Sequence, residues 1–248
     1  GLKATLGDPN RLRFAGVYPL ACGERFWPAA YPDPKLYAQR ALTALWQGAG
    51  GELGGTVREG AAPDNTKPTF ELSSPPLAEI VRDINKYSNN VMAQQVFLSL
   101  PLHRNGAARV SPDDARAFLR EWFTQRVGGP TDGLVIDNGS GLSRDARITG
   151  NMFARLLQSA WSSTVMPELM ASLPVTGLDG TLRRSKASSG RAHLKTGSLR
   201  DVNGVAGYVL GASGKRYVLV VLINHANAAA AKPVLDAATQ WAIADGPP

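Results

Sequence analysis

The chain is predicted to be an α+β protein in which helices pack on an antiparallel sheet. In the first two thirds of its 248 residues, apolar residues recur mostly at helical spacing. Three runs of strand type follow, at 193–199, 204–210 and 216–223, and Ala-Ser-Gly-Lys at 212–215 supplies turn chemistry between the last two. A final helix is expected at 228–244. Strands joined by short turns pair in antiparallel fashion, which gives the predicted class.

The N-terminal part carries few regular signals. Residues 1–30 are rich in Pro and Gly, with short β-like pieces such as Leu12-Arg13-Phe14, and resemble the end of a unit. A helix is expected from Pro34, with Asp33 as its N-cap. Residues 51–75 are predicted to be loop, with short strands around Leu53 and at 56–58.

Two helices separated by a break are predicted at 77–100. Apolar residues lie on one face before the break and on another face after it, and Asn85 to Asn90 lie between them. Ser and Asn side chains compete with helical backbone bonding, so they suit a break or a cap. The remaining segments are predicted to be helix at 112–127 and 149–162, and loop at 133–146 and, for the most part, at 166–192.

Composition narrows the classes of function. The net charge is +7, which favours anionic partners, but Lys and Arg are scattered and the densest cluster, at 183–186, has no interleaved aromatic residues. We therefore expect no nucleic-acid partner. No apolar run is long enough to span a bilayer, so we expect no transmembrane segment. The single cysteine, Cys22, excludes an intrachain disulfide, and the three histidines lack zinc-ligand spacing, so no metal is expected.

Two short motifs could carry chemistry. Ser88-Asn89-Asn90 lies at the break between helices, and Lys195-Thr196-Gly197-Ser198 lies on the first strand of the sheet. On a strand facing a groove, the charge of Lys195 and the hydroxyls of Thr196 and Ser198 would hold a small carboxylate, and Gly197 would let a ligand backbone approach. Ser88 offers a hydroxyl that can pass a proton, and Asn90 offers an amide for a peptide carbonyl.

Each motif alone also has a plain structural reading. Lys-Thr-Gly commonly marks the end of an edge strand, and Ser-Asn-Asn commonly caps a helix. Their order, separation and placement favour the functional reading. Such a pair accompanies a Ser-x-x-Lys in β-lactamases and penicillin-binding proteins.

The chain resembles the class C low-molecular-mass penicillin-binding proteins, the D-alanyl-D-alanine carboxypeptidase/endopeptidase family, from about residue 30 to the end. Four stretches carry the resemblance: 74–77 leading into 85–93, Asp137-Asn138-Gly139-Ser140-Gly141-Leu142-Ser143-Arg144, 180–184, and 193–199 with the strands that end at Asn224. Relative to the family's Asp-Gly-Ser-Gly-Leu-Ser-Arg loop, which the second stretch resembles, Asn138 is an insertion or a variant.

The resemblance implies a β-lactamase/transpeptidase-like fold and acyl transfer on peptidoglycan stem peptides in the bacterial periplasm, with no metal or organic cofactor. It implies catalytic roles for Ser88, Asn90 and Lys195, and substrate binding by Thr196, Gly197, Ser198, Leu142 and Arg144. β-Lactam antibiotics would acylate the same site. Arg144 could equally be a surface ion-pair residue.

One departure from the family is large. The family's nucleophile lies in a Ser-x-x-Lys, and no serine of this sequence has a lysine three positions later. We therefore expect residues 1–30 to be the tail of an inserted domain and 31–248 to be the C-terminal part of the transpeptidase-like domain. A missing N-terminal segment would complete the site, and the chain alone is predicted to be inactive.

Two other functions remain open from the sequence. The first is a non-catalytic module that binds peptides through the carboxylate-holding strand. The second is a serine hydrolase that uses Ser140, although Gly-x-Ser-x-Gly fails at Asn138 and a tight turn explains Gly139-Ser140-Gly141 as well.

Overall fold

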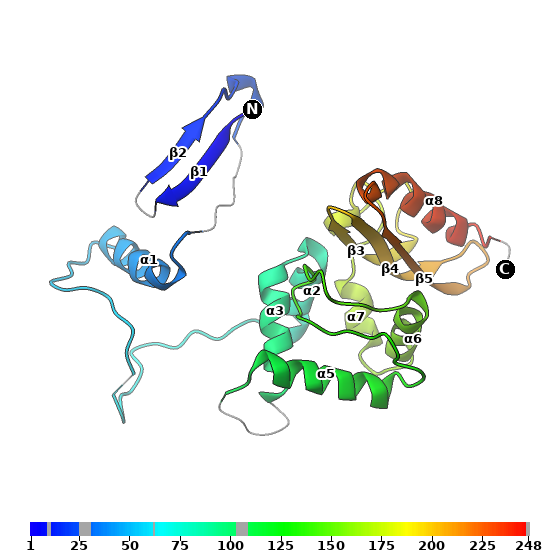
Figure 1. Ribbon diagram of the computed structural model, residues 1–248, viewed down its shortest axis with the longest axis horizontal. Coiled ribbons are helices and arrows are strands. Elements are labelled where there is room, and N and C mark those ends of the chain that lie inside the picture. The colour runs from blue at the N-terminus through cyan, green and yellow to red at the C-terminus, as the bar shows by residue number, and fades with distance from the viewer. Residues whose placement is uncertain (9–10, 25–30, 62, 103–108, 247–248) are drawn as a thin grey trace. The chain divides into compact units, whose positions relative to one another are not determined.

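The computed structural model describes residues 1–8, 11–24, 31–61, 63–102 and 109–246. The chain divides into two compact units, Gly1–Leu72 and Ser73–Pro248 (Figure 1). The predicted domain boundary after residue 30 stays a prediction. In the structure the first long helix, which follows that boundary, belongs to the first unit.

The first unit contains a two-stranded antiparallel ribbon and one helix. Strands β1 (Lys3–Asp8) and β2 (Arg11–Ala15) pair with each other, and a 3₁₀ turn, η1 (Leu20–Cys22), follows. Helix α1 (Pro34–Gly48) begins as predicted, because the Asp33 carboxylate accepts hydrogen bonds from the first turn. The strands predicted around Leu53 and at 56–58 are wrong: this segment has no regular structure, since no neighbouring strand pairs with it.

The second unit carries the helices and the three-stranded sheet. The predicted break divides α2 (Leu77–Tyr87) from α3 (Asn90–Ser99). The other predicted helices are α5 (Pro112–Arg126), α6 (Gly150–Trp161) and α8 (Lys232–Ile243), which η3 (Ala228–Ala231) precedes. Helix α7 (Met166–Ser172) and the turn η2 (Gly180–Leu182) lie in the segment predicted to be mostly loop. A seven-residue helix is too short to show a helical period, so the sequence pattern missed it.

Helices cover both faces of the sheet (Figure 1). Its order is β3 (Ala192–Leu199), β4 (Val202–Leu210) and β5 (Arg216–Asn224), all antiparallel. Successive residues of a strand point to opposite faces. Thus Val205 and Val209 of β4 pack in a core with α8, while Ala206 and Tyr208 pack in a second core with α6. This architecture confirms the predicted α+β class.

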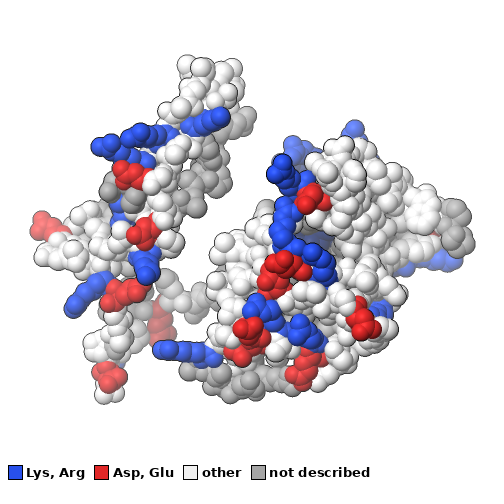
Figure 2. Space-filling model, viewed as in Figure 1, with Lys and Arg blue, Asp and Glu red and all other residues white. Residues whose placement is uncertain are grey.

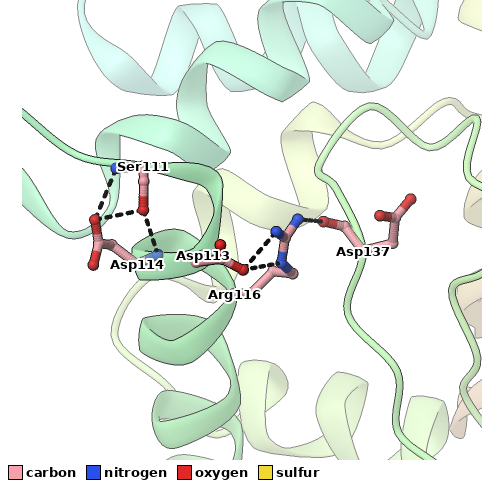
Figure 3. A network of polar contacts seen from close by, with 5 residues as sticks. All are labelled: Ser111, Asp113, Asp114, Arg116 and Asp137. Carbon is pink, nitrogen blue, oxygen red and sulfur yellow. Dashed lines mark hydrogen bonds and ion pairs between the residues drawn. The ribbon is translucent and has the colours of Figure 1, made fainter.

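Side-chain caps set where the helices begin. Ser111 and Asp114 form a capping box at the start of α5, and Thr149 caps α6. One turn into α5, Arg116 bonds the Asp113 carboxylate and donates to the Asp137 carbonyl at 2.8 Å (Figure 3). This contact ties α5 to the loop that begins at Asp137.

Charge is distributed without a continuous basic band on the face shown in Figure 2, where basic and acidic side chains of the second unit are interleaved. No helix in the described ranges is long and apolar enough to cross a membrane. The same described residues contain no group of three His, Cys, Asp or Glu side chains placed to hold a metal ion.

Candidate active site

A pocket of about 530 Å³ opens in the second unit where three segments meet. They are the break between α2 and α3, the loop at 139–142, and strands β3 and β4 with the neighbouring part of β5. Most of its wall is apolar, and polar groups converge at the break and at β3. The pocket is lined by the predicted residues Ser88, Asn90, Leu142, Lys195, Thr196, Gly197 and Ser198, among others.

Ser88 occupies an unusual backbone conformation. It ends α2 with φ 55° and ψ 49°, in the left-handed region, and Asn89 then caps α3 by accepting a hydrogen bond from the Met92 N–H. Left-handed backbone costs an L-residue about 1–2 kcal/mol, and glycine would avoid that cost. A serine at this position presents its hydroxyl to the pocket from a sharp turn. Because the strained backbone would favour glycine, the serine indicates a functional role for that hydroxyl.

This strain gives a prediction that needs no substrate. Ser88→Gly and Ser88→Ala both remove the hydroxyl, but only glycine relaxes the left-handed backbone. The glycine variant is therefore expected to be more stable than the alanine variant by about 1 kcal/mol. Urea unfolding of the two variants, monitored by circular dichroism, measures the difference. Equal stability, or a more stable alanine variant, would show that the turn carries no strain.

Lys195 faces Ser88 across the pocket. Its ammonium donates to Ser88 Oγ at 3.0 Å and to the Thr196 carbonyl at 2.9 Å. Burial lowers the pKa of Lys195, because desolvation penalises the charged form. An ammonium has three N–H donors, so one is left for a ligand. The pair joins residues 107 positions apart in sequence and brings the two predicted motifs together.

Asn90 connects the break to the pocket loop. Its side-chain amide donates to the Ser140 carbonyl at 2.6 Å, and Gln94 of the same helix accepts from the Gly139 N–H at 2.9 Å. A Cβ at Gly139 would lie 2.2 Å from the Cβ of Phe97, so only glycine fits there. Helix α3 therefore holds the loop against the pocket through three side chains.

On the strand side, hydroxyls and an open backbone line the pocket. Thr196 and Thr181 place their Oγ1 atoms 2.7 Å apart. Gly197 and Ser198 are exposed, and a Cβ added at Gly197 would meet open space. Strand β3 pairs with β4 along this stretch, and in the described chain its other edge has no strand partner there. An extended ligand can therefore approach the backbone of β3 at Gly197.

Leu142 and Arg144 take different positions. Leu142 lines the pocket and is half exposed. Arg144 is not among the lining residues, and its guanidinium forms an ion pair with Asp201, beyond the end of β3. A hydrogen bond from Arg144 is the main cause of the lowered pKa of Asp201. This arrangement fits the second of the two roles considered for Arg144, that of a surface ion-pair residue.

Ser140 is engaged in a local turn. Its hydroxyl donates to Asn138 Oδ1 at 2.7 Å and accepts from the Leu142 N–H at 3.1 Å. Asn138 Oδ1 also accepts the Ser140 N–H at 3.0 Å. The hydroxyl proton therefore points to an amide oxygen, which is no general base. These contacts fit the tight-turn reading.

Lys86, Asp179 and Thr181 do not line the pocket but contact the elements that form it, and no role was predicted for them. Lys86, two residues before Ser88, forms an ion pair with Asp179 at 2.6 Å, and the Thr181 hydroxyl contacts that of Thr196. Lys86 lies in the stretch 85–93 that carries the resemblance, but the resemblance implies no role for it. Asp179 lies in a Gly-rich loop that no period or spacing distinguishes.

Comparison with known proteins places this chain in a family. The model of the D-Ala-D-Ala carboxypeptidase 3 (S13) family matches residues 2–244. A penicillin-sensitive carboxypeptidase A of Dictyostelium discoideum is 31% identical over 184 residues, which are 72% of this chain and 35% of that protein. A D-alanyl-D-alanine carboxypeptidase of Actinomadura sp. (strain R39) is 30% identical over 208 residues, 79% of this chain and 38% of that protein.

The fold has a counterpart among solved structures. Penicillin binding protein 4 from Haemophilus influenzae, solved with a β-lactam, superposes with a TM-score of 0.71 at 21% identity and covers 90% of this chain and 52% of that chain. This likeness confirms the predicted transpeptidase-like fold. The chain spans about 35–38% of the two curated relatives above. Its family match over residues 2–244 confirms the resemblance drawn from the four stretches, and the chain belongs to the D-Ala-D-Ala carboxypeptidase 3 (S13) family.

Proposed function

We propose that this chain forms the peptide-holding part of a serine-type D-Ala-D-Ala carboxypeptidase or endopeptidase that acts on peptidoglycan stem peptides. The observation that carries the proposal is the contact of Lys195 Nζ with Ser88 Oγ at 3.0 Å, inside a pocket that Asn90 also lines. The names of the relatives support the substrate class. No metal or organic cofactor takes part in the proposed chemistry.

Each side chain has one task in the proposed reaction. The remaining N–H of Lys195 binds the terminal carboxylate of the peptide, and the Thr196 and Ser198 hydroxyls assist it. Asn90 orients the peptide carbonyl. Leu142 packs against the stem peptide, and the open backbone at Gly197 lets that peptide lie along β3. Arg144 lies outside the pocket and pairs with Asp201, so we assign it no contact with the stem.

The acyl transfer needs a nucleophile from a Ser-x-x-Lys, which this sequence does not contain. That serine would attack the carbonyl carbon between the two D-alanines, and the lysine of the motif would take its proton. The bond to the D-alanine nitrogen then breaks, and the Ser88 hydroxyl passes a proton to the leaving amine. Water hydrolyses the ester that remains. A β-lactam would acylate the same serine, and the chain alone is proposed to be inactive.

D-Alanine release tests this proposal. A peptide ending in L-Lys-D-Ala-D-Ala is incubated with this chain and with a protein extended by the coding sequence upstream. We expect release by the extended protein alone. Release of no D-alanine by an extended protein that contains a Ser-x-x-Lys would contradict the proposed reaction.

Because peptidoglycan lies outside the cytoplasmic membrane, we also propose a periplasmic location, which cell fractionation tests directly.

The lack of a Ser-x-x-Lys favours one second candidate, a non-catalytic module that binds peptide carboxylates. Titration of this chain with the same peptide and with its C-terminal amide, followed by NMR, measures the binding. Both functions predict that the carboxylate binds and that the amide does not. Upstream coding sequence without a Ser-x-x-Lys would favour the binding module.

A further inference from the structure

We infer that Lys86 and Asp179, here called the clamp, are positioning residues that hold Ser88 at hydrogen-bonding distance from Lys195. The inference deepens the proposed function and rests on it for its catalytic meaning. Neither side chain of the clamp lines the pocket. Their effect is therefore exerted through the backbone at the end of α2 and through the 179–181 segment.

The clamp joins the last turn of α2 to a distant loop. Lys86 Nζ donates to Asp179 Oδ2 at 2.6 Å and to the Leu173 carbonyl at 2.6 Å, and only 12% of the Lys86 side chain is exposed. Burial opposes ionisation of Asp179, but hydrogen bonds from Lys86 and the Val175 N–H outweigh it and lower the pKa of Asp179. A paired, mostly desolvated ammonium has few alternative positions.

Two further contacts fix the same turn. Asn85 donates to Ser172 Oγ at 2.8 Å. Gly180 lies so close that an added Cβ would approach the Lys86 carbonyl oxygen to 2.7 Å, and its φ is +53°. The end of α2 is thus held at adjacent residues by a segment from another part of the sequence. Ser88 follows only two residues after Lys86, so its backbone has little freedom.

The held segment also reaches strand β3. Thr181 lies two residues after Asp179, and its hydroxyl is 2.7 Å from that of Thr196, the neighbour of Lys195. The contacts therefore close a ring through three links. They are Lys86 with Asp179, Thr181 with Thr196, and Lys195 with Ser88. In a closed ring, the distance between Lys195 and Ser88 depends on the contact between Lys86 and Asp179. Breaking the clamp therefore loosens the contact of Lys195 with Ser88, although neither of these two residues is changed.

The test uses this chain without substrate. Asp179→Asn and Lys86→Met remove the ion pair. Asp236→Asn is the matched control, because Asp236 of α8 accepts a hydrogen bond from Ser185 at 2.7 Å and lines no part of the pocket. Amide hydrogen exchange is followed by NMR at Asn89, whose N–H donates to the Ile84 carbonyl. The side chain of Lys195 is titrated in parallel.

We expect exchange at Asn89 to accelerate by about tenfold in both clamp variants. The pKa of Lys195 is expected to rise toward its ordinary value as water reaches the ammonium. In both clamp variants, exchange at Ala206 in the sheet should be unchanged. In the control variant, both exchange at Asn89 and the pKa of Lys195 should be unchanged. A Lys86→Met/Asp179→Asn double variant should be no worse than Lys86→Met alone, because Lys86→Met already removes the ion pair, together with the hydrogen bond to the Leu173 carbonyl.

Unchanged exchange at Asn89 and an unchanged Lys195 titration in Asp179→Asn would overturn the inference, and so would an equal response in Asp236→Asn. Asp179→Asn keeps the side-chain volume, so it decides the question even where Lys86→Met unfolds the chain. These readouts require no turnover. An extended wild-type protein that releases no D-alanine would contradict the proposed function and leave the clamp result standing.

Discussion

Replacement of Lys195 by methionine is expected to reduce kcat/KM for a D-Ala-D-Ala peptide by about 100- to 1,000-fold in the extended protein. Truncating one partner of a buried, hydrogen-bonded charge pair costs about 2–5 kcal/mol, and each 1.36 kcal/mol is tenfold in rate. The ammonium of Lys195 is the group proposed to bind the peptide carboxylate, and it also contacts Ser88. Initial rates of D-alanine release at low substrate concentration measure the loss.

The matched control is Lys215→Met. Lys215 is exposed in the turn between β4 and β5, so its loss should leave kcat/KM unchanged. The Lys195 variant should remain folded, because methionine removes a charge that burial already disfavours. A folded Lys195→Met protein with activity near that of the wild type would show that another group binds the carboxylate.

Leu194→Ala is expected to destabilise the chain by about 2–5 kcal/mol. Leu194 is fully buried on β3, next to Lys195, and packs with Val209 and Leu235 between the sheet and α8. Alanine there loses the transfer free energy of the removed atoms and leaves a cavity among residues that are already close-packed. Urea unfolding of the variant and the parent chain measures the change.

Leu178→Ala is the control for this change, because Leu178 is 60% exposed. Its replacement should alter stability by no more than about 0.5 kcal/mol. A cost below about 1 kcal/mol for Leu194→Ala would show that the core between β3 and α8 is not the main support of the strand that carries Lys195.

Local signals account for the elements that could be predicted. Asp33, Ser111 and Thr149 stand where helices begin and bond to the first turn, so their side chains mark those ends in the sequence. The break at Ser88 was predictable because Ser and Asn side chains favour caps over helix interiors. Strands β3, β4 and β5 were predictable as three short runs of strand type, and turn residues at 212–215 separate the last two.

Long-range contacts account for what could not be predicted from local pattern. The approach of Lys195 to Ser88 joins residues 107 positions apart, and only the resemblance to a known pair of motifs anticipated it. The contact of Lys86 with Asp179 spans 93 positions, and neither residue was predicted to have a role, although Lys86 lies in a stretch that carries the resemblance. Segment 51–61 shows the opposite error, since the strand-like residues around Leu53 and at 56–58 have no partner to pair with.

Intact mass after incubation with a penicillin tests the central claim most directly. The claim is that this chain holds the substrate of a reaction whose nucleophile lies in a Ser-x-x-Lys that the chain does not contain. Both this chain and the protein extended upstream are incubated with penicillin, and the intact mass of each is measured by mass spectrometry. We expect a covalent adduct on the extended protein alone, located on the serine of that motif. An adduct on this chain alone would mean that one of its own serines is the nucleophile, and would contradict the proposed mechanism.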